Sequence, residues 1–360
     1  MTSLADSGRP GLTGYPSSAE WLPAVRIWLF ALAGFVLAMV VVGGATRLTG
    51  SGLSITEWQP ILGALPPLSE AAWQDAFEKY RHIPQYELVN RGMSLESFKA
   101  IYWWEWTHRL IGRLTGFVFL LPFVYFLWRR AIPKPFISRI AALFILGGAQ
   151  GALGWFMVMS GLSERVSVSQ YRLAAHLALA TAIAAYAFWL GLTIRDEAPQ
   201  KEAAKAAGSP RPAVLGAVIL AGLVYLQIIA GAFVAGLKAG LASNTWPLMN
   251  GEIVPPGMDY YSPLYMNLFE NPLTAQFVHR LIAYFIAIYA AGFALAIWRL
   301  PGLRAPAIAV GAAILVQIAL GVATIVYGVP LGFALAHQVN AIIVLALALW
   351  TVHRALGSRA

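Results

Sequence analysis

Long apolar runs separated by short polar connections dominate the hydropathy pattern of this chain. The runs of membrane-spanning length are 22–46, 102–128, 136–158, 171–194, 212–236, 273–298, 305–327 and 331–352. A hydrocarbon core ~30 Å thick needs about 20 apolar residues per helical crossing, so each run is long enough to cross once. The pattern predicts an all-α membrane protein with eight transmembrane helices.

The composition supports this prediction and narrows the chemistry. Of 360 residues, 59% are hydrophobic and 11% are charged, whereas soluble domains carry about 25% charged residues. The absence of cysteine excludes disulfides, thiolate metal sites, iron–sulfur clusters and thiol nucleophiles. Any metal must therefore be bound by histidine or oxygen ligands.

The net charge of +9 predicts an orientation, because loops rich in Lys and Arg normally face the cytoplasm. The connections after the second, fourth and sixth helices together hold ten such residues: Arg129, Arg130, Lys134, Arg139, Arg195, Lys201, Lys205, Arg211, Arg299 and Arg304. We interpret the basicity as topology, not as nucleic-acid binding. Both termini, including the tail 1–21, are then cytoplasmic, and the long 47–101 connection is periplasmic.

The first twenty residues lack the basic and apolar regions of a secretory signal, and they are too poor in Arg for a transit peptide. We therefore expect a multi-pass protein of the bacterial inner membrane that is inserted by its own helices. An imported organelle precursor is the less favoured alternative.

The chain also contains an internal repeat. Gly43 and Trp58 recur 188 residues later as Gly231 and Trp246. Further landmarks recur in the same order: His108-Arg109-Leu110-Ile111 as His279-Arg280-Leu281-Ile282, Gln150 and Gly154 as Gln317 and Gly321, and Ala175-His176 as Ala336-His337. The polar, Ala- and Lys-rich segment 196–211 is the natural linker. The repeat predicts two four-helix halves, 22–195 and 212–360, related by a pseudo-twofold axis along the membrane normal.

Four of the six histidines occupy equivalent positions, five or six residues into an even-numbered apolar run: His108, His176, His279 and His337. A single histidine in a membrane helix is usually hydrogen-bonded to a neighbouring helix, but four at one depth indicate one ligand pair per half. Two histidines leave a zinc ion two ligands short, whereas a haem needs only two axial ligands and suits an apolar pocket. The sequence thus favours a haem in each half.

The remaining histidines and a run of glycines have simpler interpretations. We expect His82 and His353 to be exposed surface residues. Small residues in the third helix allow either a neighbouring helix or a flat macrocycle to approach closely; they are Gly147, Gly148, Gly151 and Gly154.

Aromatic and basic residues surround the histidine of the second helix. Trp103, Trp104 and Trp106 are typical of an aromatic belt at the membrane interface. Arg109, and Arg280 in the second half, either bind a haem propionate or extend to the lipid headgroups.

The halves differ at one acid. Glu105 precedes His108 by three positions and Arg109 by four, so the three side chains share a helix face, whereas the matching residue of the second half is Gln276. Glu105 is either an ion-pair partner of Arg109 or an acid–base group beside one haem. The first half also has the longer outer loop, where the spacing of Trp73, Phe77 and Tyr80 predicts an amphipathic helix.

Several motifs together resemble the haem A synthase family in its proteobacterial and mitochondrial branch. They are GGATRLTGSGLSITEW at 43–58, EWTHRLIGR at 105–113, the segment Gln150 to Gly154, LAAHLALA at 173–180, HRLIA at 279–283 and LGFALAHQ at 331–338. They span nearly the whole chain. The Gram-positive branch carries paired cysteines in its outer loops, and this chain has none, so a redox role of such a pair cannot operate here.

The resemblance implies a reaction and a division of labour. The C8 methyl group of haem O would be oxidised to a formyl group by successive hydroxylations, giving haem A for cytochrome c oxidase. His279 and His337 would bind a resident haem b, His108 and His176 would bind the substrate haem, and Glu105 would be the catalytic acid. Expected partners are haem O, a haem O synthase that delivers it, an unidentified electron donor or acceptor and membrane lipid, with homo-oligomers left open.

Two other classes of protein share some of these features. A dihaem cytochrome b also needs paired histidines but has no need of an acid on one side alone. A haem carrier or exporter needs an exit path and no redox partner.

The charge pattern generates a first testable prediction. Reporter fusions should place the connection 196–211 in the cytoplasm and 47–101 in the periplasm. A periplasmic signal from a fusion at residue 205 would invert the orientation and move the histidine sites to the cytoplasmic side.

Overall fold

A computed structural model describes residues 18–59, 62–162, 165–194 and 209–357. Within these ranges, eight helices are long and apolar enough to cross a membrane: α1 (Ser18–Leu48), α4 (Leu95–Trp128), α5 (Lys134–Leu162), α6 (Gln170–Thr193), α7 (Arg211–Gly236), α9 (Pro272–Ile297), α10 (Pro301–Val326) and α11 (Leu331–Gly357). The predicted all-α fold with eight spanning helices is confirmed.

The largest boundary difference is at α4, which begins seven residues before the predicted run. The Ser94 side chain accepts a hydrogen bond from the Ser97 backbone N–H at 3.2 Å and so caps the helix at this earlier point. The extra turns carry Phe98, which is fully buried in the outer segment. The hydropathy pattern identifies only the apolar part of a helix, so it did not predict the polar first turns of α4.

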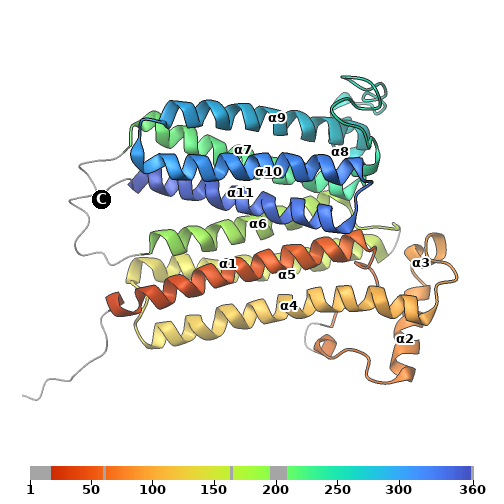
Figure 1. Ribbon diagram of the computed structural model, residues 1–360. Coiled ribbons are helices and arrows are strands. Elements are labelled where there is room, and N and C mark those ends of the chain that lie inside the picture. The colour runs from red at the N-terminus through yellow and green to blue at the C-terminus, as the bar shows by residue number, and fades with distance from the viewer. Residues whose placement is uncertain (1–17, 60–61, 163–164, 195–208, 358–360) are drawn as a thin grey trace, which may run out of the picture.

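The eight helices pack as two rings of four. In one ring, α1 and α5 each contact both α4 and α6; in the other, α7 and α10 each contact both α9 and α11. The rings meet through α1, α6, α7 and α11 (Figure 1). Each contacting pair of one ring thus has its counterpart in the other, as the repeat requires. The pseudo-twofold axis and the boundaries 22–195 and 212–360 stay predictions, and most of the linker 196–211 lies outside the described residues.

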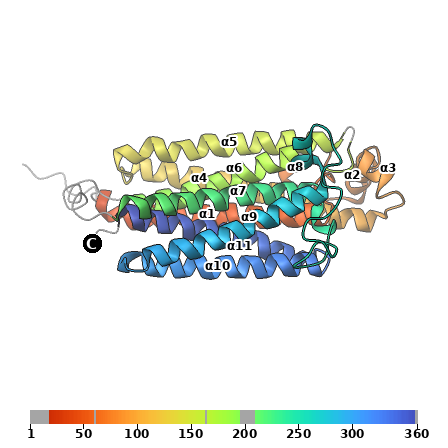
Figure 2. The ribbon, with the colours of Figure 1, turned by 90° about the horizontal axis from the view of Figure 1, so that it is seen from above.

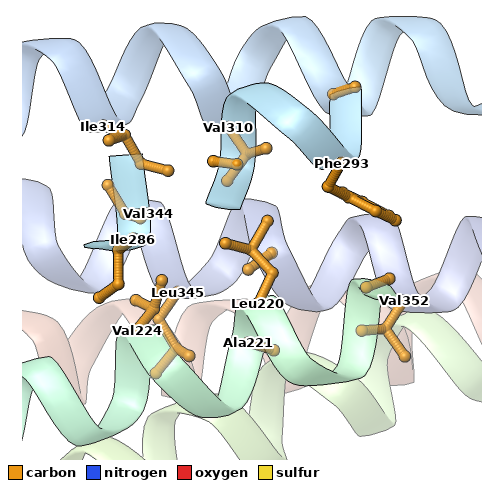
Figure 3. Close-up of a cluster of buried hydrophobic side chains, with 14 of the residues drawn as sticks. Leu220, Ala221, Val224, Ile286, Phe293, Val310, Ile314, Val344, Leu345 and Val352 are labelled. Atoms are coloured by element: carbon orange, nitrogen blue, oxygen red, sulfur yellow. The ribbon is translucent and has the colours of Figure 1, made fainter. Parts of the chain in front are cut away.

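Each ring has an apolar core at some distance from the histidines. Figure 3 shows Leu220 of α7, Ile286 of α9, Ile314 of α10 and Val344 of α11 among the buried side chains of the second ring. Ile286 follows His279 by seven residues, or about 10 Å of helix. Apolar packing therefore fills one part of the ring and leaves the histidine level to other contacts.

The long first outer connection folds over one end of the bundle. It contains α2 (Glu70–Arg81) and α3 (Pro84–Leu88), which lie at the same end as the short helix α8 (Asn267–Glu270) in Figures 1 and 2. The predicted amphipathic helix corresponds to α2, whose Trp73 and Tyr80 are buried with Phe98 and Tyr102. The short helix α3 is an addition that the sequence pattern did not reveal.

The two surface histidines differ in outcome. His82 is exposed at 78% of its side chain, as predicted. His353 is partly buried, with its ring packed edge-on against Trp189 of α6 at a centroid distance of 5.9 Å. The expectation of an exposed His353 is therefore wrong, because α6 and α11 are in contact where the two rings of helices meet.

Candidate functional site

The four repeated histidines lie on helices that are opposite one another in each ring. His108 of α4 and His176 of α6 belong to the first ring, and His279 of α9 and His337 of α11 belong to the second. All four side chains are half-buried. Opposite helices of a four-helix bundle can present two ligands to one metal centre in the core.

The second pair has the spacing of axial ligands. The ring centroids of His279 and His337 are 6.4 Å apart, and the ring planes are inclined at 70°. A metal–imidazole bond is about 2 Å long, so two imidazoles on opposite sides of one iron have ring centres roughly 6 to 6.5 Å apart. This pair therefore fits the two axial positions of a haem.

A glycine of a neighbouring helix lies against each of the four imidazoles. If each glycine carried a Cβ atom, that atom would lie very close to a histidine ring. The distances would be 2.9 Å from Gly43 to His108, 3.0 Å from Gly154 to His176, 3.1 Å from Gly231 to His279 and 2.9 Å from Gly321 to His337. Any larger residue would thus displace or crowd the ring. The glycines keep space for the imidazoles at one level of the bundle.

Among the four glycines highlighted in the third apolar run, Gly154 alone has this role. Gly147, Gly148 and Gly151 are exposed, and a Cβ on any of them would meet no atom within 4 Å. Close packing of a neighbouring helix is therefore the wrong interpretation for these three.

Three of the histidines are also held by a glutamine. The side-chain amides of Gln150, Gln227 and Gln317 donate to the backbone carbonyls of His176, His279 and His337 at 3.1, 2.8 and 3.0 Å, respectively. The same amide nitrogens lie 3.2 to 3.3 Å from the imidazole Nε2 atoms. Each glutamine precedes its glycine by four residues, one helical turn away on the same face.

Gln227 is the functional residue that the sequence analysis missed. Its signal was present, because Gln227 and Gly231 repeat the spacing of Gln150 and Gly154. Four residues before Gly43, where the other three sites have a glutamine, the chain has Met39. The Met39 side chain lies against Gly112 of α4, where its Cε would be 3.4 Å from an added Cβ atom.

Glu105 is a buried carboxylate with three donors. Its side chain is 3% exposed. Oε2 accepts from the Ser54 hydroxyl at 2.8 Å and from the Ile55 backbone N–H at 2.9 Å, and Oε1 accepts from Arg109 Nη2 at 2.7 Å. The predicted ion pair with Arg109 is therefore present. The same carboxylate also anchors the loop that follows α1.

The two arginines bind the loops of their own halves. Arg109 donates to the Ile55 carbonyl at 2.8 Å, and Arg280 donates to the Ser243 carbonyl at 3.2 Å. Ser243 follows Ile55 by 188 residues, the same offset that relates Gly43 to Gly231. Gln276 donates to the same Ser243 carbonyl at 3.0 Å. Each guanidinium is thus directed to the loop backbone of its own half, and the propionate and headgroup interpretations both stay predictions.

Arg280 differs from Arg109 in having buried donors to spare. Its Nε and Nη1 atoms are buried and make no hydrogen bond within the described part of the chain, and the same is true of His279 Nδ1. Buried guanidinium donors without partners are costly and suit a carboxylate. The second ring therefore provides two imidazoles 6.4 Å apart and a cation with buried donors, a set of groups that fits a haem and its propionate.

A polar pocket of about 260 Å³ lies outside the first ring, lined in part by Arg109, Arg113 and Lys79. Lys79 contacts Asp75 at 2.8 Å and Glu57 at 3.0 Å. These hydrogen bonds raise the pKa of Lys79 above its usual value. The lysine that lines this pocket is thus already neutralised by two carboxylates of the same lining, Glu57 and Asp75.

Comparison with known proteins agrees with the geometry. Residues 26–349 match the family described as Cytochrome oxidase assembly protein. The chain belongs to this family. A heme A synthase of Azorhizobium caulinodans is 53% identical over 337 residues, which are 93% of this chain and 95% of that protein. Heme A synthases of Parvibaculum lavamentivorans and Rhodospirillum centenum are 48% and 49% identical over 92% and 98% of this chain, and over 94% and 93% of their own lengths. The resemblance predicted from the sequence motifs is confirmed.

The contacts of Glu105 predict a stability effect. Glu105→Ala would leave the partly buried Arg109 without its counter-ion and the Ser54 and Ile55 donors without their acceptor, so we expect a loss of about 3–5 kcal/mol in the free energy of unfolding, measured in detergent. The loop 49–58 should become sensitive to protease.

The matched control is Glu57→Ala, which removes an exposed carboxylate of the same loop, and an exposed ion pair contributes about 0–1 kcal/mol. Equal effects of the two substitutions would contradict the anchoring role.

Proposed function

We propose that this protein is a haem A synthase that oxidises the C8 methyl group of haem O to a formyl group. Two hydroxylations of the methyl carbon, each a two-electron oxidation whose oxidant is supplied through the external redox partner expected above, give a gem-diol, which loses water to form the aldehyde of haem A. The supporting observation is the pairing of two equivalent histidine sites with a buried acid beside one of them. The identity to relatives named heme A synthase supports the same function.

In this proposal, the second ring holds a haem b cofactor. His279 and His337 would bind its iron, and Arg280 would bind a propionate through its two buried donors, Nε and Nη1. A bis-histidine haem b supplies a one-electron redox centre. Gln227 and Gln317 donate to the backbone carbonyls of the two histidines and so would hold the helical turns that carry the imidazoles.

The first ring would hold the substrate. His108 and His176 bind the iron of haem O and so fix the macrocycle relative to Glu105, which lies one helical turn from His108. Within the described residues, Oε1 of Glu105 accepts one hydrogen bond, from Arg109, which leaves a lone pair of this oxygen for a proton. The Ser54 and Ile55 donors keep the carboxylate in place during that step.

The predicted orientation places both histidine pairs near the periplasmic side of a bacterial inner membrane. A haem O synthase in the same membrane would supply the substrate, and cytochrome c oxidase would use the product. Extraction of pigments from membranes that contain this protein and a haem O source tests the function directly, because a dihaem cytochrome or a haem carrier would leave haem O unchanged.

The two histidine pairs should respond differently to substitution. His279→Ala or His337→Ala should remove haem b and destabilise the fold, because a bound haem stabilises the native state. His108→Ala or His176→Ala should retain haem b and abolish conversion. A full low-spin haem b spectrum in purified His279→Ala protein would contradict the assignment.

Glu105→Gln separates acid–base chemistry from loop anchoring when it is compared with Ser54→Ala. The first substitution removes the proton-accepting oxygen, and the second removes one loop contact but keeps the carboxylate. We expect the haem A yield per haem b to fall by roughly 10²–10⁴ in Glu105→Gln and by far less in Ser54→Ala, with haem O or its alcohol accumulating. Equal losses in the two variants would assign Glu105 to anchoring alone.

A further inference from the structure

One of the four histidines lacks the amide that holds the other three. Gln150, Gln227 and Gln317 each donate to the backbone of a histidine. The residue in the equivalent place before Gly43 is Met39, which points toward Gly112, one turn along α4 from His108. A thioether has no hydrogen to donate.

The missing amide affects how firmly the imidazole is held. In the other three sites, the glycine limits movement on one side, and the glutamine bonds the carbonyl of the same histidine while its nitrogen lies beside the ring. An imidazole oriented in advance loses less conformational freedom when it binds iron. Among the described residues, His108 has the glycine contact but no glutamine bond of this kind.

A second observation distinguishes the histidine pair of the first ring from that of the second ring. Arg280 has two buried donors free for an anionic group of a bound haem, whereas Arg109 forms an ion pair with Glu105 and binds the carbonyls of Ile55 and Glu57. The second ring thus has additional means of retaining a haem, and the first ring has fewer.

We propose that Met39 makes His108 the exchangeable iron ligand of this protein, so that the first ring releases its haem while the second ring retains its own. This inference rests on the proposed function, in which one haem is a substrate that must enter and leave and the other is a permanent cofactor. Met39 is then a positioning residue that sets the rate of haem exchange through His108.

The test measures haem release from purified protein. Protein from cells that supply haem O is mixed with excess apomyoglobin, and the pigments that remain bound are separated and quantified over time. Met39→Gln should slow the release of haem O and haem A by about 2- to 10-fold, the range supported by one net hydrogen bond. Haem b release should not change.

Two variants serve as controls. Met39→Leu keeps the apolar character and approximate volume without adding an amide, so its release rates should equal those of the wild type. Gln227→Met, the reciprocal change, should speed the release of haem b by a similar factor and broaden its low-spin spectrum. Structural damage would accelerate release, so a slower rate in Met39→Gln is a result that damage does not produce.

The outcomes separate this inference from the proposed function. Equal release rates in Met39→Gln and Met39→Leu overturn the role of Met39, even if the wild type produces haem A. Absence of haem A from wild-type membranes overturns the proposed function. In that case, wild-type and Met39→Gln proteins that have both been loaded with excess haem b are compared in the same release assay, and identical release curves overturn the role of Met39.

Discussion

The structure depends on placing four imidazoles inside an apolar bundle. Polar groups in a membrane interior must find hydrogen-bond partners within the protein. In a closely packed interior, an imidazole ring also fits only where the neighbouring helix has a small residue. At His176, His279 and His337, the chain meets both requirements with one pattern, a glutamine followed four residues later by a glycine. At His108, the glycine is present and Met39 stands in place of the glutamine. The glutamine satisfies the histidine carbonyl, and the glycine leaves space for the ring.

A single difference between the halves changes the charge balance of the two sites. Glu105 neutralises Arg109 and joins it to the loop after α1, while Gln276 is neutral and shares the Ser243 carbonyl with Arg280. The first site therefore contains an internal ion pair and a carboxylate, and the second contains a cation with buried donors. The same scaffold thus provides a site suited to proton transfer and a site suited to holding an anionic cofactor.

Much of this arrangement could be predicted from the sequence. Long apolar runs identify spanning helices because each must satisfy its own backbone, and His108 and Glu105 stand out because polar residues are rare there. Features that depend on contacts between distant segments could not be predicted. The hydroxyl of Ser54 meeting Glu105 and the ring of Trp189 covering His353 both require the tertiary structure. Gln227 is different, since its spacing to Gly231 was visible but its contact with His279 was not.

The two sites are also physically connected. Gln338, the residue after His337, donates to the Val40 carbonyl of α1 at 3.0 Å, and its side chain packs directly on Gly44. Gly44 is adjacent to Gly43, on which His108 lies. A Cβ atom at position 44 would overlap the side-chain amide of Gln338. Gly44 is therefore required because the two rings pack closely here, and its backbone conformation does not itself require a glycine. The turn of α11 that carries His337 is thus fixed to α1, whose Gly43 contacts His108. The relative position of the two histidine pairs is therefore set by side-chain contacts across the interface between the rings, whatever the conformation of the connection between them.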